Sequence, residues 1–268
     1  MKATKNIGLK DVQAVYSGPE GDLWELVMGE QIHIGGFKSS MDLAERAGIG
    51  SGMRGIDLCC CNGAGMRFLV RFRGVDKMTG VDATEKVVER GRQRCKQHGL
   101  SYKIDFVLAD VCASGLPDGS ADFVWGEDAW CYVVDKAKLI SEAARLVKRG
   151  GTIAFTDWIE GAKGLTDQEA ERFLRFMKFP NVQDLNGYEQ LLAKNGCKVV
   201  TAQNTGRFAP CVDLYLSMLD MQLTYDALRI IGFDTELMKA MAGEMQFMQG
   251  LAHAGKLAQG LFVARKSA

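Results

Sequence analysis

The 268-residue chain lacks the features that mark membrane-embedded, exported and nucleic-acid-binding proteins. No apolar run approaches the roughly 18 residues of a membrane-spanning helix, and residues 1–7 contain no apolar signal-peptide core. Its 33 basic side chains are balanced by 33 acidic ones, whereas nucleic-acid binding depends on a basic field that neutralises phosphates. We therefore expect a soluble, cytoplasmic protein that binds neither a nucleic acid nor a membrane.

The chain also has little proline, and its cysteines do not follow a metal-binding pattern. The four prolines are scattered rather than gathered into a linker, and the chain contains no internal repeat. Three of the eight cysteines are consecutive, at positions 59–61, whereas zinc sites use ligand pairs separated by about two to four residues. The sequence therefore predicts reduced thiols and no metal site.

From residue 54 onwards, short apolar runs alternate with longer amphipathic segments. The expected strands cover residues 55–60, 78–82, 105–109, 121–125, 151–157, 198–203 and 260–265, and the expected helices cover residues 66–70, 84–98, 136–148 and 185–195. Such an alternation predicts a doubly wound α/β fold, in which helices cover both faces of a mainly parallel sheet.

Two segments lie outside this alternation. Residues 1–50 precede the first strand, and residues 207–256 form a mostly helical insert before the last one. The insert holds six of the thirteen methionines, several of them at helical spacing. We expect these flexible side chains to fill a core, and a wall that repacks around an apolar ligand is the alternative.

Three acidic residues stand at the expected ends of successive strands. Ligands of open α/β sheets bind beyond the carboxyl ends of the strands, where the strand order reverses. Asp82 follows the small-residue turn 62–65 by about twenty residues, which is the spacing of a carboxylate that accepts both ribose hydroxyls. Asp110 is suited to the amine of adenine, with Val111 packing on the ring, and Asp57 lies near the end of the first strand. Each aspartate alone could instead cap a helix, but together they predict nucleotide binding.

The motifs around these residues resemble those of class I S-adenosylmethionine-dependent methyltransferases. The similar runs are residues 56–65, 79–84, 107–110, 116–125 and 147–157. Segments 32–37 and 126–129, together with the insert, are most similar to the sarcosine/dimethylglycine and tocopherol types of this family. The resemblance implies a Rossmann-like seven-stranded sheet whose last strand is antiparallel.

The same resemblance implies a cofactor, S-adenosyl-L-methionine, and a division of the chain. Residues 1–50 would be a helical lid, 51–206 the cofactor-binding domain, 207–256 an insert on the acceptor side and 257–268 the last strand. The residues expected to contact the cofactor are Asp57, Cys59, Gly63, Asp82, Ala83, Asp110, Val111 and Glu127. The sequence departs from the family where Cys59 and Cys61 replace glycines, because cysteine adopts positive φ less freely than glycine.

Methyl transfer from a sulfonium is an in-line displacement, so it needs alignment more than strong acids or bases. His33 is the candidate general base for an amine acceptor, although it could simply donate to backbone beside residues 35–36. Tyr16 and Trp130 are candidates to hold a cation over an aromatic ring, with Trp24, Tyr132 and Trp158 as further aromatic residues, although each could be packing alone. Arg207 could clamp an acceptor carboxylate or be a solvated surface residue.

We therefore expect a small-molecule methyltransferase, a monomer or a homodimer, that N-methylates a small amine or amino acid. C- or O-methylation of an apolar ring is the nearest alternative. A cofactor-binding protein without catalysis is a third hypothesis, prompted by the missing glycines. A nicotinamide-dependent oxidoreductase is the fourth, because Tyr132 and Lys136 have the Tyr-x-x-x-Lys spacing of short-chain dehydrogenases.

Overall fold

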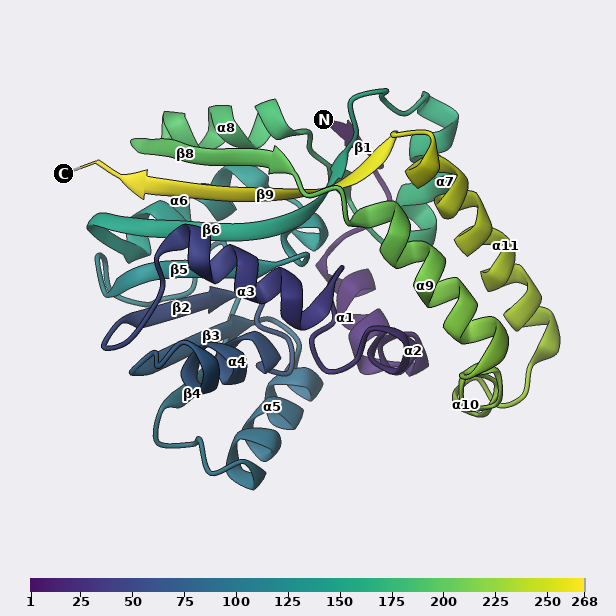
Figure 1. Ribbon diagram of the computed structural model, residues 1–268, viewed down its shortest axis with the longest axis horizontal. Coiled ribbons are helices and arrows are strands. Elements are labelled where there is room, and N and C mark those ends of the chain that lie inside the picture. The colour runs from purple at the N-terminus through teal and green to yellow at the C-terminus, as the bar shows by residue number, and fades with distance from the viewer. Residues whose placement is uncertain (268) are drawn as a thin grey trace.

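The computed structural model describes residues 1–267 and contains a seven-stranded sheet in the order β4-β3-β2-β5-β6-β9-β8 (Figure 1). The strands are β2 Arg54–Leu58, β3 Lys77–Asp82, β4 Ile104–Leu108, β5 Ala121–Glu127, β6 Val147–Glu160, β8 Cys197–Asn204 and β9 Leu257–Lys266. Strands β2 to β6 pair in parallel, whereas β9 runs antiparallel to both β6 and β8. The predicted fold, a seven-stranded sheet with an antiparallel last strand, is confirmed.

Helices cover both faces of this sheet. On one face lie α6 (Lys136–Leu146) and α8 (Leu185–Lys194), which share a core with apolar residues of the central strands. On the other face lie α3 (Gly36–Ala47), α4 (Ala64–Phe72) and α5 (Glu85–Gln97). The helix predicted over 136–148 ends at Leu146, because β6 already begins at Val147, which pairs with Ala121.

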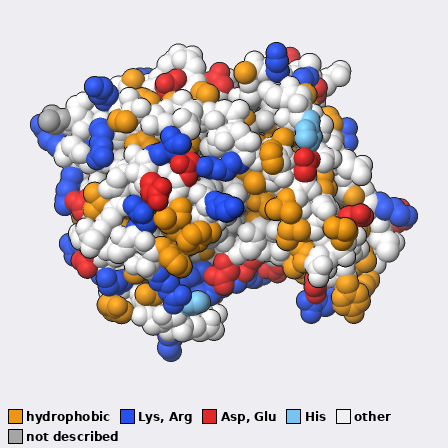
Figure 2. Space-filling view, in the orientation of Figure 1, with side chains coloured by type: hydrophobic (Ala, Val, Ile, Leu, Met, Phe, Trp, Pro, Cys, Tyr) orange, Lys and Arg blue, Asp and Glu red, His pale blue; other side chains and the backbone are white. Residues whose placement is uncertain are grey.

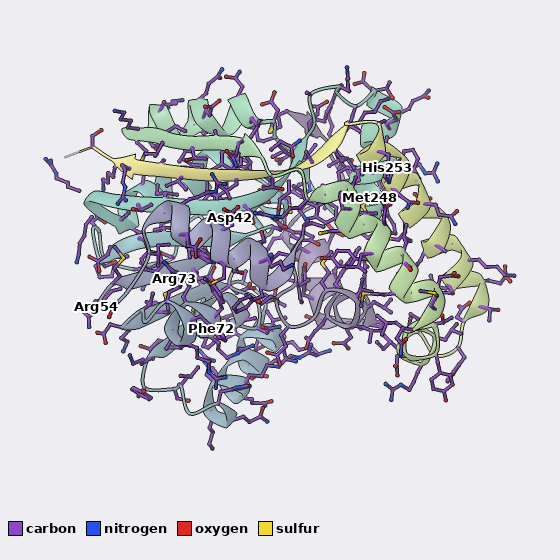
Figure 3. The ribbon with its side chains drawn as sticks, viewed as in Figure 1. Asp42, Arg54, Phe72, Arg73, Met248 and His253 are labelled. Carbon is purple, nitrogen blue, oxygen red and sulfur yellow. The ribbon has the colours of Figure 1, made fainter. Side chains whose placement is uncertain are left out.

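The N-terminal helices and the insert form a second core at one end of the sheet. Helices α1 (Leu9–Ser17) and α2 (Pro19–Met28) lie between the sheet and the insert helices α9 (Phe208–Met221), α10 (Thr224–Ile230) and α11 (Thr235–His253) (Figure 1). Trp24 and Val27 of α2 share a buried cluster with Tyr215 of α9 and Met248 of α11. The insert methionines are thus divided: Met245 and Met248 are core residues, whereas Met221 is 75% exposed. Figure 3 labels the buried Met248 and the exposed His253 of α11.

Shorter elements complete the chain. The strand β1 (Lys2–Ala3) pairs antiparallel with β7 (Asn181–Val182), and helix α7 (Asp167–Met177) packs against α11. A 3-10 helix, η1 (Trp130–Tyr132), follows β5. Acidic and basic side chains are interspersed over the face drawn in Figure 2, in keeping with the balanced charge of the chain. Within the described residues, no helix has both the length and the apolar character needed to cross a bilayer.

Candidate functional site

A cavity opens at the carboxyl ends of the central strands, where the strand order reverses between β2 and β5. About 930 Å³ of empty space, open solvent at the mouth included, lies between its lining residues. Its sheet side consists of strand ends and the loop after β2, and its other side consists of α1 and residues 30–33. The N-terminal segment therefore covers the site, as a lid would.

Most of the predicted site residues line this cavity. They are Tyr16, His33, Asp57, Cys59, Asp82, Ala83, Asp110, Val111 and Glu127. Gly63 lies behind the wall instead, as the N-cap of α4 with a φ of 76°. A Cβ at Gly63 would come within 2.6 Å of the Phe106 ring. The positive φ and this close contact therefore both require glycine at this position.

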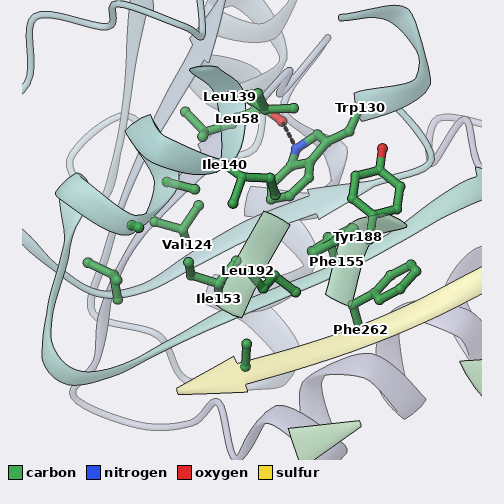
Figure 4. Close-up of a cluster of buried hydrophobic side chains, with 14 of the residues drawn as sticks. Leu58, Val124, Trp130, Leu139, Ile140, Ile153, Phe155, Tyr188, Leu192 and Phe262 are labelled. Atoms are coloured by element: carbon green, nitrogen blue, oxygen red, sulfur yellow. Dashed lines mark hydrogen bonds between the residues drawn. The ribbon is translucent and has the colours of Figure 1, made fainter. Parts of the chain in front are cut away.

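The structure places Trp130 away from the cavity. Its side chain is fully buried, stacks on Phe155 at 4.0 Å and donates from Nε1 to the Leu58 carbonyl oxygen at 3.2 Å (Figure 4). The η1 turn directs this ring back into the core beneath the strand ends. Trp24 and Trp158 are likewise core residues. Of the aromatic residues considered, Tyr16 and Tyr132 line the cavity, and their rings meet edge to face at 5.4 Å.

Arg207 does not reach the cavity either. Its guanidinium forms an ion pair with Asp42 of α3 and lies 3.4 Å from the Ser39 hydroxyl. This contact joins the start of the insert to α3. The alternative role suggested for Arg207, as a clamp for an acceptor carboxylate, therefore has no support in its position.

Two carboxylates converge on a glycine at the start of α4. Asp57 is buried, and its burial, together with the nearby Glu127 and Asp82, raises the pKa of its carboxyl well above the ordinary value. A Cβ built on Gly65 would lie 2.8 Å from Oε2 of Glu127 and 3.5 Å from Oδ2 of Asp57. The absence of a side chain at Gly65 thus leaves room for both carboxylates at the cavity wall.

Asp82 lines the cavity and also orders the backbone around it. Its Oδ1 accepts from the Thr84 amide and its Oδ2 from the Cys61 amide, each at 2.9 Å. Burial raises the pKa of Asp82, while these amide hydrogen bonds counteract the rise. Asp110 similarly accepts from the Cys112 amide at 2.8 Å. Both aspartates therefore order their own turns while they line the cavity.

The loop after β2 keeps a glycine-like backbone although its residues are cysteines. Cys59 has a φ of 64° and Cys61 a φ of 47°, both in the left-handed region. Burial, with Asp82 as the next cause, raises the pKa of the Cys61 thiol to about 12. All eight cysteines are free thiols, and no acidic, histidine or cysteine cluster suited to a metal ion occurs in residues 1–267.

A hydrogen-bonded cluster that sequence reasoning missed surrounds Glu127. The Ser40 hydroxyl lies 2.6 Å from Oε1 of Glu127 and 3.1 Å from Nε2 of His33, and Gln31 donates to it at 2.9 Å. The neighbouring Asp128, with a φ of 49°, accepts from the Ile34 amide at 2.7 Å. No local sequence pattern distinguishes Ser40 from Ser39, so nothing in the sequence singled out Ser40. Asp128 had a sequence signal, because it lies inside the motif 126–129.

Ion pairs attach residues of the N-terminal segment to α4 and α5. Arg67 of α4 donates to Glu30 at 2.6 Å and to the backbone oxygen of Asn62 in the loop after β2. Glu25 of α2 pairs with both Arg90 and Arg94 of α5. The segment that covers the cavity is therefore tied to two helices that follow the cavity-lining loops.

Beneath the cavity lies a buried polar cluster on β6. Asp157 accepts from the Tyr188 hydroxyl and, at 2.9 Å, from the Cys131 amide of η1. Burial raises the pKa of Asp157 to about 6, although Lys136 and Tyr188 act in the opposite direction. Lys136 donates to the backbone oxygens of Cys131 and Val133. This cluster holds η1, which carries Tyr132 to the cavity.

A second cavity lies between α2 and the insert. Its apolar lining includes Trp24 and Val27 of α2 and three insert methionines, Met238, Met241 and Met245. Its charged lining residues, among those described, are Glu20, Asp213 and Asp220, and all three are acidic. The insert methionines thus belong partly to a core, as predicted, and partly to a cavity wall, as in the alternative.

Comparison with known proteins agrees with this architecture. Residues 56–155 match the family model described as a methyltransferase domain. The structure of a proposed sarcosine dimethylglycine methyltransferase from Galdieria sulphuraria superimposes with a TM-score of 0.81, at 23% identity. The superposition covers 93% of this chain and 98% of that chain. The fold therefore extends beyond the matched domain to the lid and the insert.

Curated relatives differ in the atom that they methylate. A sarcosine/dimethylglycine N-methyltransferase of Halorhodospira halochloris is 26% identical over 215 residues, which are 73% of this chain and 75% of the relative. A sterol 24-C-methyltransferase of Aspergillus fumigatus is 30% identical over 117 residues, which are 44% of this chain and 31% of the relative. The chain spans less than two thirds of the length of several such relatives. The family model identifies residues 56–155 as a methyltransferase domain, and the shared motifs and the strand order are those expected of the class I S-adenosylmethionine-dependent type.

Proposed function

We propose that this protein transfers the methyl group of S-adenosyl-L-methionine to a small molecule, and that the acceptor is an amine. The observation that carries the proposal is the charge of the cavity. Asp57, Asp82, Asp110, Glu127 and Asp128 all line it, whereas no lysine or arginine occurs among its described lining residues. Such a lining favours cations, and both a sulfonium and an ammonium are cationic.

The proposed cofactor contacts follow the order of the strands. Asp82 would accept both ribose hydroxyls, with Ala83 and Cys59 beside the sugar. Asp110 would accept the adenine amine, and Val111 would pack on the ring. Asp57 and Glu127 would face the ammonium of the methionine part, while Gly63 shapes the turn behind it. Bound in this way, the cofactor supplies an electrophilic methyl group on a sulfonium.

The residues on the lid side would hold the acceptor. Tyr16 and Tyr132 offer aromatic rings at the cavity, where a cationic group is attracted to a ring face. His33, which lines the cavity and is 3% exposed, is the proposed base that removes a proton from the amine. The lid and the insert would thus exclude water and align the amine for in-line displacement.

C- or O-methylation of an apolar acceptor is the second candidate function. The observation that favours it is the methionine-lined cavity between α2 and the insert. Flexible thioether side chains adapt to bulky apolar molecules. A sterol and a tocopherol methyltransferase are among the relatives with similar sequences.

The two remaining hypotheses, a nicotinamide-dependent oxidoreductase and a cofactor-binding protein without catalysis, receive less support. The buried ammonium of Lys136 is bonded to backbone oxygens and does not line the cavity, so it offers no Tyr-Lys pair for hydride chemistry. The left-handed backbone at Cys59 and Cys61 keeps the turn that glycine would give, so the missing glycines no longer argue against a working cofactor site.

The first test is a calorimetric titration with S-adenosylhomocysteine, with NADH as the control ligand. We expect micromolar affinity, and a loss of at least tenfold in Asp82→Asn, which keeps the side-chain size but weakens acceptance of two hydroxyls. Asp226→Asn on the exposed surface of α10 is the matched control and should bind like the parent. Absence of S-adenosylhomocysteine binding would refute the proposal.

Transfer assays then separate the two candidate acceptors. Labelled S-adenosyl-L-methionine is offered with a panel of small amines and amino acids and, separately, with phenolic and isoprenoid acceptors. Methyl incorporation into amines supports the proposal. Incorporation confined to the apolar panel favours the second candidate. Binding without transfer to any member favours a non-catalytic protein.

A further inference from the structure

A fully buried hydroxyl joins the lid segment, α3 and the end of β5. Ser40 lies on α3 with none of its surface exposed. Its Oγ lies 2.6 Å from Oε1 of Glu127, 2.9 Å from Nε2 of Gln31 and 3.1 Å from Nε2 of His33. Residues 31–40 and the distant end of β5 therefore meet at one oxygen atom.

The chemistry of the three partners determines where the protons lie. A hydroxyl has one proton to donate and two lone pairs. The carboxylate of Glu127 can only accept, so the Ser40 proton points to it, and the Gln31 amide nitrogen can only donate, so it takes one lone pair. The other lone pair faces Nε2 of His33, which must carry a proton. The same Nε2 lies 3.3 Å from Oε1 of Glu127, a second acceptor.

This arrangement assigns different tasks to the two oxygens of Glu127. Oε1 is held by Ser40 and His33, whereas Oε2 faces Gly65, at 2.8 Å from a Cβ built there. Within the described residues, Oε2 has no hydrogen-bond partner, and Glu127 lines the cavity. Oε2 is thus free to accept a hydrogen bond from a ligand.

We infer that Ser40 is a positioning residue of this site: it holds Glu127 so that Oε2 faces the cavity, and it holds His33 in the tautomer protonated at Nε2. The other ring nitrogen of His33, Nδ1, lies 3.4 Å from the Ile34 carbonyl oxygen. The inference rests on the proposed function, in which Glu127 contacts the cofactor.

The neighbouring serine provides a matched control. Ser39 is equally buried on the same helix, but its hydroxyl lies near Arg207 and not near Glu127. We expect Ser40→Ala to weaken S-adenosylhomocysteine binding about tenfold, because it removes a hydrogen bond to a charged group. The affinity of Ser39→Ala for S-adenosylhomocysteine should stay within about twofold of that of the parent protein. Thermal melts of both variants check that each is folded at the temperature of the titration.

A double-mutant cycle separates positioning from a general loss of packing. If Ser40 acts through Glu127, then Ser40→Ala should change the affinity less than about twofold in a Glu127→Gln background. An equal loss in both backgrounds would overturn the inference, because the effect would then bypass the carboxylate. In a working enzyme, Ser40→Ala should raise the KM for the cofactor more than it lowers kcat.

Nitrogen-15 NMR of the imidazoles tests the same inference without a ligand. The chain has three histidines, so the signal of His33 can be assigned by one substitution. We expect a protonated Nε2 in the parent protein and a mixture of tautomers in Ser40→Ala. A bare Nε2 in the parent would overturn the inference. If Glu127→Gln leaves the affinity unchanged, the proposed cofactor contact fails, and the NMR result alone decides the role of Ser40.

Discussion

The backbone amide of Cys61 donates a 2.9 Å hydrogen bond to Oδ2 of Asp82 on the neighbouring strand. Cys61 makes this contact with a φ of 47°, a conformation that costs about 1–2 kcal/mol for a residue with a Cβ. The loop after β2 is therefore anchored to the carboxylate proposed to bind ribose, and the anchor is maintained against backbone strain.

This strain predicts that Cys61→Gly stabilises the protein. We expect a gain of about 0.5–1 kcal/mol in the free energy of unfolding, because the relief of strain exceeds the extra entropy of glycine in the unfolded chain. Chemical denaturation measures it. Cys60→Gly is the control: this buried residue has no positive φ, so the substitution should destabilise by about 1–2 kcal/mol. Destabilisation by both variants would contradict the argument.

Gly65 and Gly243 are expected to respond in opposite ways to alanine. A Cβ at Gly65 meets Oε2 of Glu127, whose side chain is already held by Ser40, so Gly65→Ala should weaken S-adenosylhomocysteine binding at least tenfold. Gly243 lies inside α11 with open space around it, and Gly243→Ala should stabilise by about 1 kcal/mol through helix propensity. Titration and thermal melts measure the pair, and an unchanged affinity in Gly65→Ala would refute the close approach.

The Asp157 cluster predicts a stability that depends on pH between about 4 and 6. The folded pKa of Asp157, about 6, lies above its ordinary value of 3.8, so folding favours the protonated form. Its ionisation therefore destabilises the fold progressively as pH rises through this range, by up to about 3 kcal/mol. Asp157→Asn has no carboxyl group to ionise at this position, so the variant does not lose this stability.

Unfolding free energies of the parent protein and Asp157→Asn, measured at several pH values, test this expectation. The variant should gain stability relative to the parent from pH 4 to 6, and the difference should be constant above that. Tyr188→Phe removes a hydrogen bond that lowers the Asp157 pKa, so it should extend the window to higher pH. If the difference in unfolding free energy between the parent protein and Asp157→Asn does not change with pH, then Asp157 is not the group that titrates.

The lid should loosen when its ion pairs with α5 are removed. Glu25→Gln removes the carboxylate that Arg90 and Arg94 share, and leaves Asp22 beside Arg90 and Glu30, at 3.9 Å, beside Arg94. Amide exchange in α1 and α2 should accelerate about five- to tenfold, which corresponds to about 1–1.4 kcal/mol of local stability. Glu236→Gln breaks an exposed pair with Lys239 and serves as the control. Unchanged exchange in Glu25→Gln would mean that the Glu25 carboxylate does not contribute to holding α1 and α2.

The sequence predicted well which residues at the strand ends line the cavity. It predicted less well where the surrounding side chains point. Asp82 and Asp110 line the cavity as their spacing indicated, because parallel strands in sequence order bring their carboxyl ends to one edge. Trp130 was placed at the mouth by its position after β5, but the η1 turn directs the ring into the core. Spacing along a chain predicts where a residue lies, and not where its side chain points.

Ser40 escaped prediction for a different physical reason. Its role depends on contact with Glu127, 87 residues away, and no periodicity within α3 reports such a contact. The departure at Cys59 and Cys61 could be recognised from sequence, but its outcome could not. The sequence could not show whether these cysteines would keep the positive φ of glycine, because the surrounding loop determines their backbone conformation. In the structure the loop imposes positive φ on both.

The path of the chain around the insert has a consequence for how such proteins diversify. Asn204 at the end of β8 pairs with Gly260 of β9, so the chain leaves the sheet and returns to it at neighbouring points. Topologically, the whole excursion through α9, α10 and α11 is one enlarged hairpin connection. A connection of this kind can be lengthened, shortened or exchanged without changing the neighbour of any strand. The insert is thus built as a replaceable module, while the turns proposed to face the nucleotide follow β2, β3 and β4 and lie outside it.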